Sequence, residues 1–164
     1  ARQLGLRNPV RVAASALVSG WDFEQPGESV GALAARQVYE ASGIGPGELS
    51  CVELHDASAP SELMAYEYLD LCQPGEGIHL LESGATRLGG RIPVNTSGGL
   101  LRKGHPIGAS GCAQIVELTE QLQGRAGDRQ VQGARIGMAH NGGGAIGLDA
   151  AATVVSLLVR EELK

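Results

Sequence analysis

The feature that most limits the fold of this chain is the alternation of short, β-branched apolar runs with segments of helical periodicity. Strands are predicted at Val10–Val18, Cys51–Leu54, Ala134–Ala139 and Ala150–Val159. Helices are predicted over Ser29–Ser42, from Ser58 to about Leu71, and from Ala109 to Gly124. Strands that alternate with helices favour a mainly parallel sheet covered on both faces. We therefore expect an α/β domain, closed by a hairpin between its last two strands.

Two parts of this pattern need separate treatment. The stretch Gln73–Arg91 is rich in glycine and is predicted as mostly loop. The following segment Arg91–Asn95 can be a strand only at a sheet edge, because Pro93 has no N–H to donate to a neighbouring strand. The helix from Ala109 is strongly apolar near its start and is predicted to be mostly buried. Its expected buried positions are Cys112, Ile115, Val116, Thr119 and Leu122, with the face widened by Ala109, Ala113 and Leu118.

Charge and hydropathy exclude several classes of partner. The chain has 13 Lys and Arg against 18 Asp and Glu, a net charge of −5, whereas a nucleic-acid binder concentrates positive charge. No apolar run reaches the 18 or so residues of a membrane span, and residues 1–7 lack the apolar core of a signal peptide. We expect no nucleic-acid partner, no membrane partner and a cytoplasmic location.

Length and cysteine usage define the expected organisation. A chain of 164 residues suits one domain, residues 1–164, and buries about two thirds of its unfolded surface. Cys51, Cys72 and Cys112 are widely spaced and form no Cys-x-x-Cys pair, which predicts reduced, packing thiols and argues against structural zinc. The chain does not begin with Met, so we expect it to be the C-terminal part of a longer protein.

Three of the four histidines fall where a strand ends or a helix begins. They are His55, His105 and His140, whereas His79 lacks that context. In open α/β folds this edge is where ligands bind, so three histidines at one edge favour a site over isolated packing roles. A metal site would require the three to converge with a carboxylate such as Asp56, which spacing does not establish.

Two familiar signatures are only partly matched. Gly142–Gly147 fits G-x-G-x-x-G, but a β-branched strand follows it where dinucleotide binding needs a helix. Gly108–Cys112 is close to the nucleophile elbow G-x-S-x-G, but its last position is Cys and no strand leads into it. Ser110 is therefore interpreted as a residue of the helix start, and neither signature defines the chemistry.

A longer pattern resembles a known family. Asn95-Thr-Ser-Gly-Gly99, followed by Lys103-Gly-His-Pro-Ile-Gly-Ala-Ser-Gly111, resembles the C-terminal histidine signature of thiolases, which make or cleave β-ketoacyl-CoA thioesters. His55-Asp56 before a helix, and His140-Asn141 before a glycine run, resemble the lipid-transfer-protein or sterol-carrier-protein type of thiolase. The similarity runs from about Val10 to Val159, nearly the whole chain.

The resemblance implies a fold and a set of roles. The fold would be a thiolase-like C-terminal domain, an α/β structure with a five-stranded mixed sheet layered with helices and a buried central helix starting near Ala109. The histidine matching His105 would activate a nucleophilic cysteine, and His55 would support an oxyanion site. His140 would be a third catalytic residue. Backbone and oxyanion positions would be Asn141, Gly142, Gly143 and Gly144, and substrate-binding positions Ser97, Gly98, Gly104 and Tyr66.

The resemblance also implies partners. The substrate would be an acyl-CoA thioester of lipid or steroid side-chain metabolism, with coenzyme A as part of the substrate and no separate cofactor or metal. The nucleophilic cysteine of thiolases lies in an N-terminal half that this sequence does not contain. We therefore expect that missing half as a partner, together with a homo-oligomer and an OB-fold accessory protein.

Departures from the family pattern leave two hypotheses open. The lipid-transfer type has an acid/base cysteine where this chain has Ala57, and other thiolases place theirs where it has His140. The first hypothesis is a relative that performs retro-aldol cleavage of a CoA thioester, with His140, His105 or Tyr66 as base. The second is a non-catalytic scaffold or association domain whose partner supplies the active site, supported by the few cations near His105, namely Arg102 and Lys103. Both hypotheses expect the isolated domain to be inactive.

Overall fold

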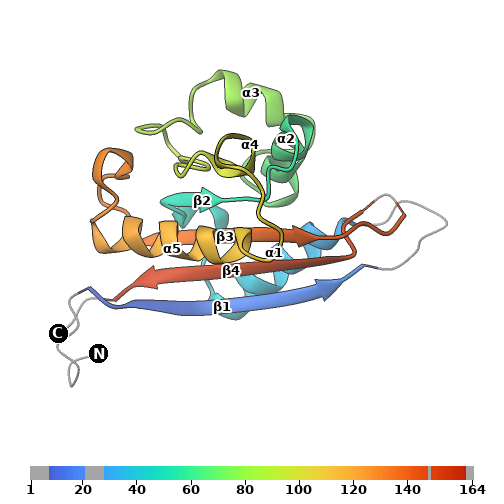
Figure 1. Ribbon diagram of the computed structural model, residues 1–164, viewed down its shortest axis with the longest axis horizontal. Helices are drawn as coiled ribbons and strands as arrows, with labels where there is room; N and C mark the ends of the chain where they lie inside the picture. The colour runs from blue at the N-terminus through green and yellow to red at the C-terminus, as the bar shows by residue number, and fades with distance from the viewer. Residues whose placement is uncertain (1–7, 21–27, 148, 162–164) are drawn as a thin grey trace.

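The computed structural model describes residues 8–20, 28–147 and 149–161, and its centre is a mixed sheet of four strands (Figure 1). The strands are β1 (Val10–Ser19), β2 (Cys51–Glu53), β3 (Ile136–Gly143) and β4 (Ala152–Arg160), in the order β1-β4-β3-β2. Only the β2–β3 pair is parallel, whereas β4 runs antiparallel to both β3 and β1. The α/β class and the closing β3–β4 hairpin are confirmed, and the prediction of a mainly parallel sheet is wrong.

The prediction of five strands is also wrong, and Pro93 explains the difference. Val94 forms a single parallel bridge with Val52 at the outer edge of β2. The Val52 N–H donates to the Pro93 carbonyl at 3.0 Å, and the Asn95 N–H donates to the Val52 carbonyl at 2.8 Å. Pro93 has no N–H, so this ladder cannot extend through it. The segment takes the edge place of a fifth strand but forms only one bridge.

Helices α1 (Val30–Ser42) and α5 (Ser110–Gln123) cover opposite faces of the sheet. Leu157 belongs to the core cluster that contains the α1 residues, while the adjacent Leu158 packs with Leu118 of α5. Successive residues of a strand point to opposite faces, so β4 contributes to both cores. The Ser29 hydroxyl caps α1, and α1 ends at Gly43, which has φ +69°.

Three shorter helices lie beyond the β2 edge. They are α2 (Ala59–Tyr68), α3 (Gly77–Glu82) and α4 (Gly99–Lys103), and two 3₁₀ turns occupy Pro46–Glu48 and Gly127–Arg129. The Ser58 hydroxyl accepts the Ser61 N–H at 3.3 Å, as its predicted N-cap role requires. The loop predicted between residues 73 and 91 contains α3, and α4 lies inside the segment that leads to His105.

The buried side of α5 differs from the predicted one. Leu118 and Leu122 are buried, but the other buried side chains of the helix are largely polar and include Gln114, Glu117 and Gln121. The apolar positions expected inside are largely outside: Val116 is 58% exposed, Ile115 is 36% exposed and Cys112 is exposed. Apolar periodicity identified the helix correctly and placed Leu118 and Leu122 inside, but Cys112, Ile115 and Val116 of the same predicted face are exposed.

The buried polar side of α5 is held by charge pairing. The Arg129 guanidinium donates to the Glu117 carboxylate at 2.9 Å, and the Gln121 amide donates to the same carboxylate at 2.9 Å. Burial raises the pKa of Glu117, but these bonds outweigh that effect and leave the pKa below its usual range. None of the helices in the described residues is long and apolar enough to cross a bilayer.

Candidate functional site

His55 and His105 meet at the end of β2 that faces α4. Their rings pack edge to face, with centroids 4.9 Å apart and planes at 90°. His55 follows β2 and is half-buried, whereas His105 follows α4 and is exposed. The Asn95 side-chain oxygen accepts the Leu54 N–H at 2.9 Å, which fixes the backbone just before His55. Two imidazoles predicted from separate motifs therefore share one site.

Asp56 is the residue that holds the His105 segment in place. Its buried carboxylate accepts the Leu100 N–H at 2.6 Å and the Leu101 N–H at 3.3 Å, at the start of α4. Gly99 has φ +61°, and a Cβ at this position would lie 2.0 Å from the Asp56 Oδ2 atom. Only glycine allows the backbone to approach the carboxylate this closely. The His-Asp motif thus supplies one imidazole and anchors the segment that carries the other.

Each of the two imidazoles is anchored through its Nδ1 atom. His55 Nδ1 lies 2.7 Å from the Asn141 side-chain oxygen, and His105 Nδ1 lies 2.8 Å from the Ser110 hydroxyl. Within the described parts of the chain, no hydrogen bond reaches Nε2 of either ring. Ser110 is buried at the start of α5, so the helix itself orients His105. Two anchored imidazoles with free Nε2 atoms can accept or donate protons.

His140 lies apart from this pair, although it is adjacent in sequence to Asn141. Its side chain points to the α1 side of the sheet, as does that of Met138 two residues earlier, and it is only 4% exposed. Its Nδ1 atom accepts the His55 N–H at 3.4 Å, and its Nε2 atom lies 3.4 Å from the Tyr68 hydroxyl. Burial, with a smaller contribution from His55, lowers the pKa of His140 to about 3.

The glycine run begins inside the sheet. Gly142 and Gly143 are the last residues of β3 and pair with Thr153 and Ala152 of β4. On its other side, β3 extends beyond β2, which ends at the Glu53–Ala139 pair. Gly144 leaves the strand with φ +65°. The oxyanion role of these glycine N–H groups stays a prediction.

Ser97, one of the predicted substrate-binding residues, is tied to the buried Glu53 carboxylate. Ser97 donates its hydroxyl and its N–H to Glu53, and Lys103 donates to the Ser97 hydroxyl at 2.5 Å. Gly98 and Gly104 flank α4 with φ +98° and +88°. Burial raises the pKa of Glu53 although the Lys103 ammonium is 3.7 Å away. The Ser97 hydroxyl is thus engaged within the protein.

Tyr68, for which the sequence predicted no role, lies beside a histidine, whereas the predicted Tyr66 does not contact one. Tyr66 is fully buried and donates its hydroxyl to Glu62, so it lies outside the histidine pair. Tyr68 is instead the tyrosine beside a histidine, with its ring centroid 5.3 Å from that of His140. Sequence reasoning missed Tyr68 because it identifies the helix but not which of two tyrosines, two positions apart, faces the sheet end.

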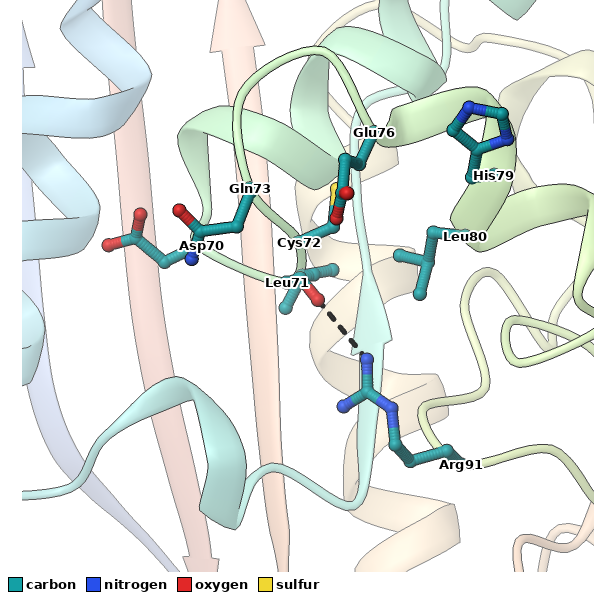
Figure 2. Close-up of a pocket in the computed structure, with 8 residues that line it drawn as sticks. All are labelled: Asp70, Leu71, Cys72, Gln73, Glu76, His79, Leu80 and Arg91. Atoms are coloured by element: carbon teal, nitrogen blue, oxygen red, sulfur yellow. Dashed lines mark hydrogen bonds between the residues drawn. The ribbon is translucent and has the colours of Figure 1, made fainter.

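The described residues also line a cavity that none of His55, His105 and His140 borders. It has a volume of about 420 Å³, with Cys72, Glu76, His79 and Arg91 in its wall (Figure 2). The Arg91 guanidinium donates to the Leu71 carbonyl at 3.1 Å, which closes one side of it. Across the described ranges, no group of three His, Cys, Asp or Glu side chains could hold a metal ion.

Comparisons with known proteins give the wider context of this geometry. Residues 23–156 match the family described as Thiolase C-terminal domain-like. The chain is 49% identical to "Sterol carrier protein 2" of Rattus norvegicus over 74% of this chain and 21% of that protein. It is 43% identical to "Benzoylsuccinyl-CoA thiolase subunit BbsB" of Thauera aromatica, and 45% identical to "Acetyl-CoA acetyltransferase" of Methanothermobacter thermautotrophicus. These two alignments cover 87% and 83% of this chain, but 38% and 37% of the relatives.

A solved structure has the same fold. The "Ltp2-ChsH2(DUF35) aldolase" matches with a TM-score of 0.79 and 24% sequence identity, over 95% of this chain and 41% of that one. The chain thus spans about a fifth to two fifths of the length of the proteins that it matches.

Proposed function

Because the chain belongs to the thiolase C-terminal domain-like family, we propose that it supplies the histidine wall of a lipid-transfer-type site for acyl-CoA thioesters. The pairing of His55 with His105, each anchored through Nδ1, carries this proposal. An N-terminal half of the thiolase type would supply the opposite wall. The isolated chain would then bind acyl-CoA weakly and would be inactive.

The chemistry that suits this wall needs acids and bases, not a thiol. In a retro-aldol cleavage of a β-hydroxyacyl-CoA, a base takes the hydroxyl proton and the Cα–Cβ bond breaks. The electron pair moves onto the thioester oxygen as an enolate, and a proton is then returned to Cα. Exposed His105 is suited to the base role, and His55 in its protonated form to stabilising the enolate oxygen. Ala57, which occupies the position of the family's acid/base cysteine, favours this reaction over thiolysis.

His140 has a supporting role in this proposal. Its ring is buried and both nitrogens face protein groups, so it does not reach a substrate on the His105 side. Its pKa of about 3 keeps it neutral at physiological pH, which allows its Nδ1 atom to accept the His55 N–H. Coenzyme A would enter as part of the substrate, with no other cofactor.

We propose that an apolar face of the described residues is where an N-terminal half of the thiolase type docks. Leu17 and Val154 are paired neighbours on β1 and β4, and both are exposed, at 68% and 36%. Val154 lies on the same sheet face as Leu158, which packs against α5. With Ile115 and Val116 of α5, these residues form what we call the open face. The relatives contain more than half of their length outside the aligned region, and we propose that a segment of this kind covers it.

The first experiment places this chain in a complete enzyme. The aligned segment of the Methanothermobacter acetyl-CoA acetyltransferase is replaced by this chain, and acetyl transfer from acetyl-CoA is measured. We expect a folded fusion with little transfer, and a gain of at least tenfold when Ala57→Cys supplies the acid/base thiol. A fusion with full transfer at Ala57 would contradict the assignment of altered chemistry. A folded fusion with no gain from Ala57→Cys would contradict the site itself.

The open face can be tested separately. Val116→Lys places a charge on a 58% exposed position, so the free energy of unfolding of the isolated chain should change by less than about 0.5 kcal/mol. In the fusion, the same charge would be buried against the docked half, and we expect a clear loss of thermal stability. Glu40→Lys, an exposed change on α1, is the matched control. Equal behaviour of both variants in the fusion would rule out docking at this face.

The scaffold hypothesis remains the second candidate, and one observation favours it. Lys103, one of the two cations near His105, is engaged with Ser97 and Glu53, which leaves Arg102 as the other basic side chain of that segment. A pocket for the phosphates of coenzyme A needs cations. If the fusion assembles but neither binds acyl-CoA nor gains activity with Ala57→Cys, the scaffold function is supported.

A further inference from the structure

We propose that Asn141 is a positioning residue that keeps the proton of neutral His55 on Nδ1, so that Nε2 of His55 is a proton acceptor. The proposal deepens the proposed function, because it assigns the chemical character of one imidazole in that site. Asn141 was expected at a backbone or oxyanion position, and the proposal gives its side chain a separate role. Its test needs no substrate.

The hydrogen-bond chemistry of the amide carries the first step. His55 Nδ1 lies 2.7 Å from Asn141 Oδ1. An amide oxygen can only accept, so the bond requires the proton to be on Nδ1. The two nitrogens of an imidazole are distinct, and the bond made by one determines the state of the other. In neutral His55, Nε2 therefore carries a lone pair.

Asn141 packs between His55 and the start of α5, with its amide oxygen on the His55 side. The amide nitrogen lies against Gly111 in the first turn of α5, where a Cβ would come within 2.8 Å of it. The backbone of Asn141 is held in β3 opposite Val154. The amide is thus confined between the helix and the histidine, with its oxygen toward the ring. This close approach also gives a reason for glycine at position 111.

On the other face of the sheet, His140 carries its proton on the opposite ring nitrogen. Its Nδ1 atom accepts the His55 N–H, so its proton lies on Nε2, which faces the Tyr68 hydroxyl. Consecutive residues, His140 and Asn141, thus hold the backbone and the side chain of His55 from two sides. The chain contains four histidines, so this contrast can be resolved residue by residue.

The assignment has a consequence for the reaction. Neutral His55 cannot donate a hydrogen bond from Nε2, so it cannot stabilise a negatively charged oxygen in that form. Only the imidazolium, which carries protons on both nitrogens, can do so. Neutral His55 would therefore act as an acceptor through Nε2, and only the protonated ring would act as an oxyanion donor.

Two-bond ¹⁵N–¹H correlation spectra of the untagged 164-residue chain test the proposal, because they separate protonated from unprotonated ring nitrogens. At a pH where the histidines are neutral, we expect Nδ1–H for His55 and Nε2–H for His140, with His79 as the exposed reference. Asn141→Asp keeps an acceptor and should keep the His55 state. Asn141→Leu removes the acceptor and should shift His55 toward Nε2–H.

Two results would overturn the proposal. One is an Nε2–H signal for His55 in the unmodified chain, which would mean that the Asn141 amide donates to it. The other is an unchanged His55 state in Asn141→Leu. If that variant does not fold, the unmodified chain and Asn141→Asp still decide the question. Because no acyl-CoA is present, failure here is distinguishable from failure of the proposed function.

Discussion

Gly99→Ala is expected to destabilise the chain by about 3 kcal/mol or more. Two costs add at this position. A left-handed backbone costs a residue with a Cβ about 1–2 kcal/mol, and Gly99 has φ +61°. The new methyl group would also lie 2.0 Å from the Asp56 Oδ2 atom, so the carboxylate must leave the Leu100 and Leu101 N–H groups. Buried donors without partners cost about 1–3 kcal/mol.

The measurement is the free energy of unfolding in urea, with Gly89→Ala as the matched control. Gly89 has φ +86°, and a Cβ there would meet nothing within 4 Å, so this variant pays only the backbone cost. We also expect Gly99→Ala to lose the His55–His105 contact, seen as altered histidine signals in NMR spectra. Equal losses for the two glycine variants would mean that Asp56 does not hold α4.

A second large effect is expected from His140 as the pH falls. The folded-state pKa of His140 is lowered to about 3, whereas the unfolded chain titrates near 6.5. Below pH 6.5 the unfolded state binds the extra proton, so stability is lost as pH falls from 6.5 and the loss is complete near pH 3. The full loss from this group is on the order of 5 kcal/mol, at about 1.4 kcal/mol per pH unit.

The comparison that isolates this effect is His140→Gln against the unmodified chain. Glutamine can accept the His55 N–H but does not titrate, so the difference in unfolding free energy between the two proteins should shrink as pH falls from 7 to 4. His79→Gln, on the exposed side of α3, should leave the pH dependence unchanged. A pH dependence that His140→Gln leaves intact would show that other groups cause the acid sensitivity.

The sequence predicted most of the elements because their signals are local. The Ser29–Ser42 stripe, the Ser58 cap and the glycine at position 43 act within a few residues, and the structure bears them out. The strand at 91–95 was placed correctly at an edge, but one missing N–H at Pro93 reduced it to a bridge. Local sequence signals therefore predicted the helices and strands, whereas strand pairing depended on residues far apart in sequence.

The incorrect prediction for α5 concerned which side of the helix is buried. Apolar periodicity placed Val116 inside, but the polar side of α5 is buried because Arg129 and Thr96 satisfy Glu117. Such partners are far apart in sequence and leave no periodic signal. Most of the apolar side is exposed in the described residues, so the apolar pattern did not mark the core of this chain.

The histidine site was predictable in part. Placing His55 and His105 at strand and helix ends predicted their approach, and their rings are 4.9 Å apart. The length of β3 could not be predicted from the sequence, and it determines the face of the sheet on which the His140 side chain lies. Because β3 continues to Gly143, the two-residue alternation sends His140 to one face of the sheet and Asn141 to the other. The catalytic role of each residue stays a prediction.

The central claim is that this chain is one wall of an acyl-CoA site in which His105 acts only when the other wall is present. Acetyl transfer from acetyl-CoA by the Ala57→Cys fusion, with and without His105→Ala, tests it most directly. We predict no turnover by the isolated chain, turnover by the fusion, and a loss of about a hundredfold or more with His105→Ala. His79→Ala should change nothing. Turnover by the isolated chain, or a His105→Ala fusion as active as its parent, would contradict the claim.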